Sequence, residues 1–114
     1  MKGAGLEAIG RSAFVRTSGG RLLGAALHKG QRLTADGALL FETDSFAHAV
    51  LTFTASGVEA KLSVYDPRWV RIHVDRRPAK VLVDGKDRPF EYDATAQYVQ
   101  VACSRVREVR VQYD

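Results

Sequence analysis

Three aromatic residues, Tyr65, Trp69 and Tyr98, stand where polar and apolar side chains alternate along the sequence. In a β-strand, successive side chains point to opposite faces, so these rings are predicted to lie on the polar, outer faces of their strands. A flat exposed ring can stack on the C–H groups of a sugar or on a nucleic acid base. The alternative for Trp69, and the favoured one, is packing against a neighbouring domain or under a loop.

Four arginines close to Trp69 suggest a second chemistry, because guanidinium groups make phosphate contacts. They are Arg68, Arg71, Arg76 and Arg77. The chain carries 17 Lys and Arg residues against 13 Asp and Glu, a net charge of +4. This mild excess agrees with binding to nucleic acid or another polyanion. An ordinary charged face of a sheet is the simpler interpretation, because acidic residues are interspersed throughout.

The sequence contains no recognisable metal or nucleophile motif. The three histidines, His28, His48 and His73, do not have the spacing of metal ligands, and the single cysteine has no partner. Neither a Gly-x-Ser-x-Gly elbow nor a glycine-rich phosphate loop occurs. We therefore expect no metal ion and no cofactor.

Paired carboxylates are the remaining catalytic candidates. Glu91 and Asp93 are predicted to share one face of a strand, at a separation that glycosidic hydrolysis would accept. However, Asp84, Asp87 and Asp93 occupy turn-like positions, where carboxylates accept hydrogen bonds from backbone N–H groups. A chain of 114 residues also offers little depth for a cleft. We therefore expect a protein that is not an enzyme and has no catalytic residues.

Alternating patterns predict the elements that must position these residues. Strand-like runs of about six residues recur every eight to twelve residues after residue 20, and no helical periodicity persists over three turns. Lys29-Gly30 and Asp36-Gly37 are expected to end strands, and Asp84-Gly85 predicts a tight hairpin turn. The predicted fold is an all-β, antiparallel β-sandwich of short strands joined by tight turns. The expected strands cover residues 21–28, 38–43, 46–54, 58–65, 69–75, 79–83, 88–92, 97–103 and 108–113.

The domain organisation follows from composition and length. Residues 1–20 are rich in Gly, Ala and Ser and are predicted to be a flexible lead-in, with a short strand near residues 13–15. Residues 21–114 are long enough for one domain with its own core. The N-terminal residues lack the apolar segment of a signal peptide, and no apolar run reaches the roughly 18 residues of a membrane helix. The sequence thus predicts no membrane contact and leaves the compartment open.

Over residues 47–113 the chain resembles the C-terminal β-sandwich accessory domains that follow the catalytic barrels of glycoside hydrolases. Three segments carry the resemblance: residues 78–86 with their Asp84-Gly85-Lys86 turn, residues 90–93 with Phe90 and Tyr92-Asp93, and the closing residues 109–113. The resemblance implies a non-catalytic module that packs on a catalytic domain and sometimes contacts carbohydrate. It assigns no functional residue.

The sequence therefore predicts an accessory or interaction domain of carbohydrate-active proteins. Its partner would be a catalytic domain or another protein chain, and Trp69, Tyr65 and Tyr98 are the candidates for contact with a glycan. The alternatives are a polyanion-binding β-module that uses the four arginines, with nucleic acid ranked below glycan, and a structural domain that oligomerises through open sheet edges.

Overall fold

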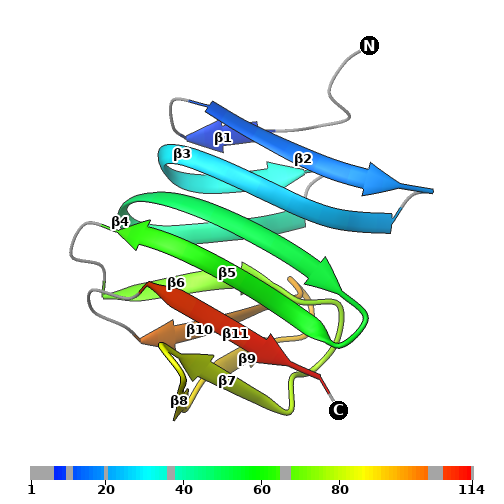
Figure 1. Ribbon diagram of the computed structural model, residues 1–114, viewed down its shortest axis with the longest axis vertical. Coiled ribbons are helices and arrows are strands. Elements are labelled where there is room, and N and C mark those ends of the chain that lie inside the picture. Colours follow the sequence, from blue (N-terminus) through cyan, green and yellow to red (C-terminus); the bar gives the residue numbers. More distant parts are fainter. Residues whose placement is uncertain are drawn as a thin grey trace.

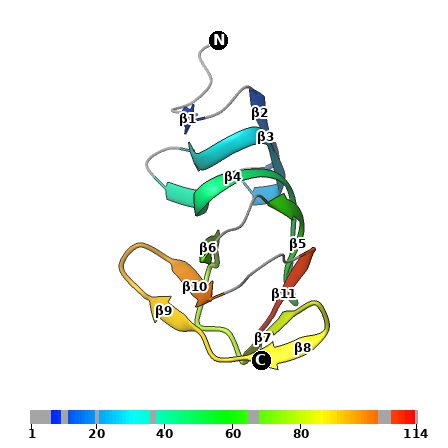
Figure 2. The ribbon, with the colours of Figure 1, turned by 90° about the vertical axis from the view of Figure 1, so that its left-hand side faces the viewer.

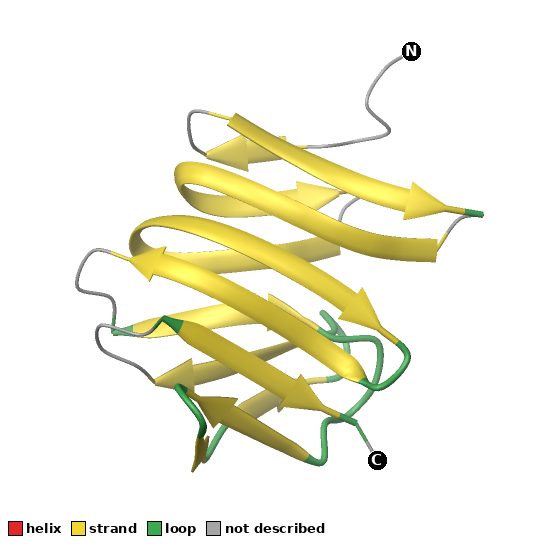
Figure 3. Cartoon of the chain, in the orientation of Figure 1, coloured by secondary structure: helices red, strands yellow, loops and turns green. Residues whose placement is uncertain are grey.

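The computed structural model describes residues 7–9, 12–19, 21–35, 38–64, 68–102 and 107–113. Within these ranges the regular elements are β-strands that pair antiparallel in one sheet (Figures 1 and 3). The predicted all-β antiparallel class is therefore confirmed. The strands are β1 (Glu7–Ile9), β2 (Ser12–Ser18), β3 (Arg21–Ala35), β4 (Ala38–Thr54), β5 (Gly57–Val64), β6 (Trp69–His73), β7 (Lys80–Val83), β8 (Lys86–Arg88), β9 (Glu91–Asp93), β10 (Tyr98–Ala102) and β11 (Glu108–Gln112).

Two long strands organise the sheet. β3 has 15 residues and β4 has 17, and they pair with each other along most of their length. On its other edge β4 is shared: residues 47–54 pair with β5, whereas residues 41–43 pair with β6. The path from edge to edge is β8-β7-β11-β5-β4-β6-β10-β9, with β3, β1 and β2 attached beyond β4.

The sheet curls into a half-barrel because β3 and β4 bend across it (Figure 2). One half holds β2, β5, β11, β7 and β8, and the other holds β1, β6, β10 and β9 (Figure 1). The two halves enclose the core between them. Hydrogen bonding runs continuously from one half to the other through β3 and β4, so the strands form one bent sheet. The finer expectation, a β-sandwich, stays a prediction.

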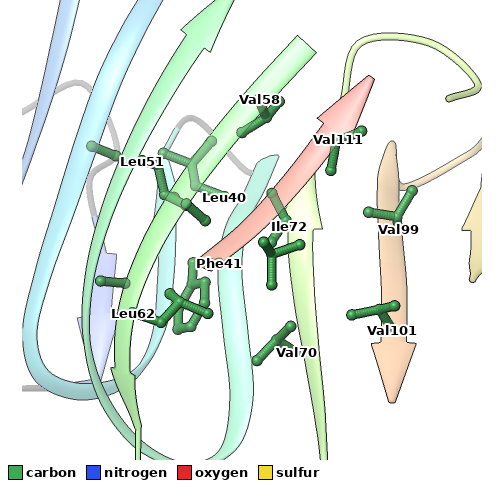
Figure 4. Packing of buried hydrophobic residues seen from close by; sticks show 14 of the residues in the cluster. Leu40, Phe41, Leu51, Val58, Leu62, Val70, Ile72, Val99, Val101 and Val111 are labelled. Atoms are coloured by element: carbon green, nitrogen blue, oxygen red, sulfur yellow. The ribbon is translucent and has the colours of Figure 1, made fainter. Parts of the chain in front are cut away.

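The core is built from the inward-pointing side chains, which occupy every second position along a strand. Fully buried side chains come from β6 (Val70, Ile72), β10 (Val99, Val101) and β11 (Val109, Val111). Phe41 at the start of β4 is the largest buried side chain and is 0% exposed. Side chains from both halves gather in one cluster (Figure 4). Each such burial contributes about 1.5–3 kcal/mol relative to an exposed side chain, so the core holds the two halves together.

The Asp84-Gly85 turn forms as predicted. Both residues have positive φ (51° and 83°), which is the conformation of a type I′ hairpin, and they join β7 to β8. The Asp84 carboxylate accepts hydrogen bonds from the N–H groups of Arg107 (3.0 Å) and Glu108 (2.9 Å). The turn therefore also fixes the start of β11.

Several predicted strand boundaries are wrong. Lys29-Gly30 does not end a strand but lies inside β3, and β4 continues through residues 44–45 where two strands were expected. The predicted strand over residues 88–92 is divided at Pro89 into β8, which pairs with β7, and β9, which pairs with β10. β3 and β4 are longer than the predicted short strands. Each of them bends, so that one strand contributes residues to both halves of the sheet. Within the predicted lead-in, β1 and β2 pair with β3.

Gly57 provides a test of how closely β5 and β11 approach. A methyl group at this position would overlap the carbonyl oxygen of Val111. We expect Gly57→Ala to lower the free energy of unfolding by about 3 kcal/mol, because the backbone of a buried strand must move. Gly85→Ala is the control: that site is open, and only its positive φ costs about 1 kcal/mol. If chemical denaturation showed a smaller loss in the free energy of unfolding for Gly57→Ala than for Gly85→Ala, this packing would be contradicted.

Candidate functional site

The outer face of β6 and β10 carries the residues that the sequence singled out. On both strands the valines and isoleucine point into the core, so Trp69, Arg71 and His73 on β6 and Tyr98 and Gln100 on β10 lie on the outer side. Antiparallel pairing places Arg71 opposite Gln100 and His73 opposite Tyr98. The structure thus brings two of the three predicted aromatic residues onto one surface.

Arg71 lies at the centre of this surface. Its Nε donates a hydrogen bond to Gln100 Oε1 (2.7 Å) and its Nη1 donates to Glu42 Oε1 (3.0 Å). The guanidinium carbon is 4.6 Å from the ring centroid of Trp69 and 5.1 Å from that of Tyr98. At these distances a planar cation is attracted to both rings. We call these five residues the arginine cluster.

The arginine cluster belongs to a polar row that crosses four strands. Glu91 of β9 is opposite Gln100, Gln100 is opposite Arg71, and Arg71 is opposite Glu42 of β4. Only backbone pairing brings Arg71 and its two partners together, since each of them is 29 residues away in the sequence. The Glu42 carboxylate offsets the charge of Arg71 within a half-buried pair. The row therefore offers hydrogen-bonding groups rather than a strong positive field.

A bend in β4 fixes the beginning of β6. We call residues 43–47, where β4 passes from β6 to β5, the β4 corner. Thr43 Oγ1 donates a hydrogen bond to the carbonyl oxygen of Trp69 (3.0 Å), and the Asp44 carboxylate accepts one from the N–H of Arg68 (2.9 Å). The backbone on both sides of the Trp69 ring is therefore anchored to the corner, which sets where the indole lies on the surface.

An open groove of about 410 Å³ runs beside the indole. Trp69 and the half-buried Phe90 supply apolar wall, while Glu91, Gln100 and Arg68 supply polar groups. A volume of this order suits a small ligand. The sequence alone did not indicate Glu42, Gln100 and Phe90, because their role depends on which strands become neighbours. The groove is lined by Arg68, Trp69, Pro89, Phe90, Glu91, Gln100 and Ala102.

The remaining predicted site residues do not converge on this groove. Tyr65 lies outside the described residues. Arg76 lies 4.5 Å from the ring of Tyr113 and donates a hydrogen bond to the carbonyl oxygen of Ala55 (2.7 Å). Arg77 lies 5.8 Å from the ring of Tyr92. Of the four arginines, only Arg68 and Arg71 are near the aromatic pair.

Asp93, one of the two carboxylates considered for catalysis, and the turn residue Asp84 have structural partners. Asp93 accepts hydrogen bonds from the N–H groups of Thr95 and Ala96, both at 2.9 Å, in the turn between β9 and β10. Asp84 is engaged at the start of β11 in the same way. Among the residues that the structure describes, no three His, Cys, Asp or Glu side chains gather as a metal site, and no helix is long and apolar enough to cross a membrane.

His73 lies at the edge of the outer face, beside a pocket of about 290 Å³ that Phe53, Asp75, Arg76 and Tyr113 also line. Its Nδ1 is buried and makes no hydrogen bond within the described part of the chain. Burial lowers the pKa of His73, against the opposing effects of Asp75 and of nearby backbone groups. Burial also raises the pKa of Tyr113 to about 12, and the Tyr113 hydroxyl accepts a hydrogen bond from the Asp75 N–H (3.1 Å).

Comparison with known protein families and with curated proteins finds no match to this sequence. The arginine cluster and its groove are thus the observations from which a function can be argued. They join half-exposed aromatic rings, neutral and charged hydrogen-bonding groups and a fixed backbone on a single surface.

The lowered pKa of His73 predicts a pH dependence of stability. The ordinary histidine pKa is 6.5, so below that pH the unfolded chain takes up a proton that the folded protein resists. The contribution of His73 to the free energy of unfolding is therefore complete above pH 6.5 and is lost as the pH falls below it. We expect the wild type to lose more stability than His73→Gln between pH 8 and pH 5 in urea denaturation. Equal losses in both proteins would show that His73 titrates normally.

Proposed function

We propose that this protein is a non-catalytic domain that binds carbohydrate on the outer face of β6, β9 and β10 and serves as an accessory or interaction module of carbohydrate-active proteins. The observation that carries the proposal is the position of Arg71 between the rings of Trp69 and Tyr98, where Gln100 and Glu42 hold it by hydrogen bonds.

The arginine cluster favours sugar binding because it fixes the rings in advance. A mobile surface ring loses conformational entropy when a ligand immobilises it, and a ring already packed on a guanidinium loses less. A sugar in the groove would stack its C–H groups on Trp69 and Phe90. Its hydroxyl groups would accept hydrogen bonds from Arg68 and donate them to the Glu91 carboxylate. With the Gln100 amide they could do both. Hydroxyl groups act as both donors and acceptors, so they match such a mixed set.

The arrangement of strands supports the role as an accessory module. The segments that resemble glycoside hydrolase accessory domains form the β7–β8 hairpin, β9 and the closing strand β11. We take the two halves of the half-barrel to be the two layers of a sandwich in which β3 and β4 cross from one layer to the other. A catalytic domain or another protein chain would then be its partner.

Polyanion binding and oligomerisation have less support. The charge of Arg71 is offset by Glu42, and Arg76 and Arg77 are turned to other aromatic rings. The edge strand β8 is only three residues long and consists of the exposed, charged residues Lys86, Asp87 and Arg88. Short charged edges disfavour pairing with a second chain.

Sugar binding can be tested by glycan-array screening followed by calorimetry on the best ligand. We expect Trp69→Ala to weaken binding about tenfold, as loss of roughly 1–2 kcal/mol of stacking would do. Arg76→Ala removes an exposed arginine stacked on a different ring and is the matched control, with unchanged affinity. If a glycan bound equally well to both variants, the binding site would lie elsewhere, and the proposal would fail.

Replacement of Arg71 separates the roles of shape and charge. Arg71→Lys keeps the positive charge but cannot donate in a planar fork to both Gln100 and Glu42 or stack flat between two rings. We expect it to weaken glycan binding several-fold while the far-ultraviolet circular dichroism stays unchanged. Full affinity in this variant, together with a steep loss of binding as salt is raised, would instead indicate a polyanion site.

A further inference from the structure

We propose that His28 and His48 form a binding site for a divalent copper or nickel ion on β3 and β4. The two residues are 20 positions apart, and their Nδ1 atoms lie 2.9 Å from each other. The ring centroids are 4.3 Å apart with an interplanar angle of 44°. His28 is exposed and His48 is half-buried, so an ion from solution can reach both imidazoles.

A β-bulge brings the two histidines together. Leu27 pairs with Ala49 and Gly30 with Ala47, so that His28 and Lys29 on β3 oppose His48 alone on β4. Such a bulge re-aims side chains and occurs frequently beside functional sites. It also explains why the sequence showed no metal spacing, because the ligand pair arises from strand register and not from a local motif.

The backbone at the bulge is strained. Lys29 has a φ of 54°, in the left-handed region, which is unfavourable for a residue with a side chain. Glycine would adopt this conformation without that cost, and Gly30 is the next residue. Strain that persists in a structure is often associated with function. Here its result is the close approach of two imidazole rings.

The distance between the two nitrogens is shorter than a tetrahedral ion requires. With metal–nitrogen bonds of about 2.0–2.1 Å, two ligands 2.9 Å apart subtend an angle of about 90° at the ion. A tetrahedral site would need about 3.4 Å with the same bond lengths. Right angles are typical of square-planar or tetragonal Cu²⁺ and Ni²⁺, and imidazole is a suitable ligand for both ions.

The proton between the rings can be relocated without a change of charge. A neutral imidazole carries its proton on either Nδ1 or Nε2, so the Nδ1–H of one ring can become an Nε2–H and free both Nδ1 lone pairs. His48 Nδ1 also accepts a 3.3 Å hydrogen bond from the Lys29 N–H, which is exposed and would bond to water once the ion is bound. Water molecules would fill the remaining coordination positions.

One groove beside the pair has an apolar lining. A groove of about 230 Å³ beside the two histidines is lined otherwise by alanines, Leu27 and Val50, and Val50 is 54% exposed. An apolar shell restricts water around a bound ion and strengthens its interaction with the ligands. No residue that lines this groove also lines the groove beside Trp69, so the proposal does not rest on the proposed carbohydrate binding.

The test is titration of the whole protein with copper chloride and nickel chloride, followed by calorimetry, and by electron paramagnetic resonance for Cu²⁺. We expect His28→Ala and His48→Ala each to weaken binding about tenfold or more, since even loss of an outer hydrogen-bonding partner has effects of this order. His73→Gln is the matched control and should keep the wild-type affinity. Zinc chloride should bind more weakly than either ion.

Two results would overturn the proposal. One is a wild-type affinity no greater than that of the His28→Ala/His48→Ala double variant. The other is a Cu²⁺ spectrum of the wild type without hyperfine coupling from two imidazole nitrogens, a measurement that does not depend on how any variant folds. Either result would leave the 2.9 Å contact as an N–H···N hydrogen bond alone.

Discussion

The structure depends on the division of one edge of β4 between two partners. Backbone N–H and C=O groups in a sheet must be paired, and β4 satisfies this by giving residues 47–54 to β5 and residues 41–43 to β6. The strand must therefore bend, and its neighbour β3 bends with it. Because β5 and β6 each begin one half of the sheet, this single division makes the halves face each other. Phe41, Leu51 and the inward valines then close the core between them.

The same bend connects the fold to the candidate carbohydrate site. At the β4 corner, the side chains of Thr43, the last residue paired with β6, and of Asp44 bind the backbone of Trp69 and Arg68. Glu42, just before the corner, offsets the charge of Arg71. One short stretch of β4 thus anchors the groove wall, orients the guanidinium between two rings and reduces the positive field. A chain with a net charge of +4 consequently presents a mixed polar surface here.

Irregular positions in otherwise regular strands carry both proposed sites. At its corner β4 changes partner, and at His28–Lys29 the neighbouring strand β3 contains an extra residue. Regular alternation leaves side chains of neighbouring strands at fixed separations on a flat surface. The bulge changes those separations locally, which lets two imidazoles approach to 2.9 Å, and the corner lets the side chains of Thr43 and Asp44 bind the backbone beside Trp69. The rest of the sheet supplies the rigidity that holds these positions.

The sequence by itself determined the β class, the inward valines of β6, β10 and β11, the Asp84-Gly85 turn and the outward positions of Trp69 and Tyr98, because alternation and turn chemistry are local properties of a strand. Only the tertiary structure decided that β3 continues through Lys29-Gly30, that β4 spans both halves and that the chain changes partner at Pro89. It also decided that Arg71 meets Gln100 and Glu42, each 29 residues away, and that His28 meets His48. Those outcomes depend on which strands pair and in which register, and hydrogen bonds between distant segments set that register, which no local pattern encodes.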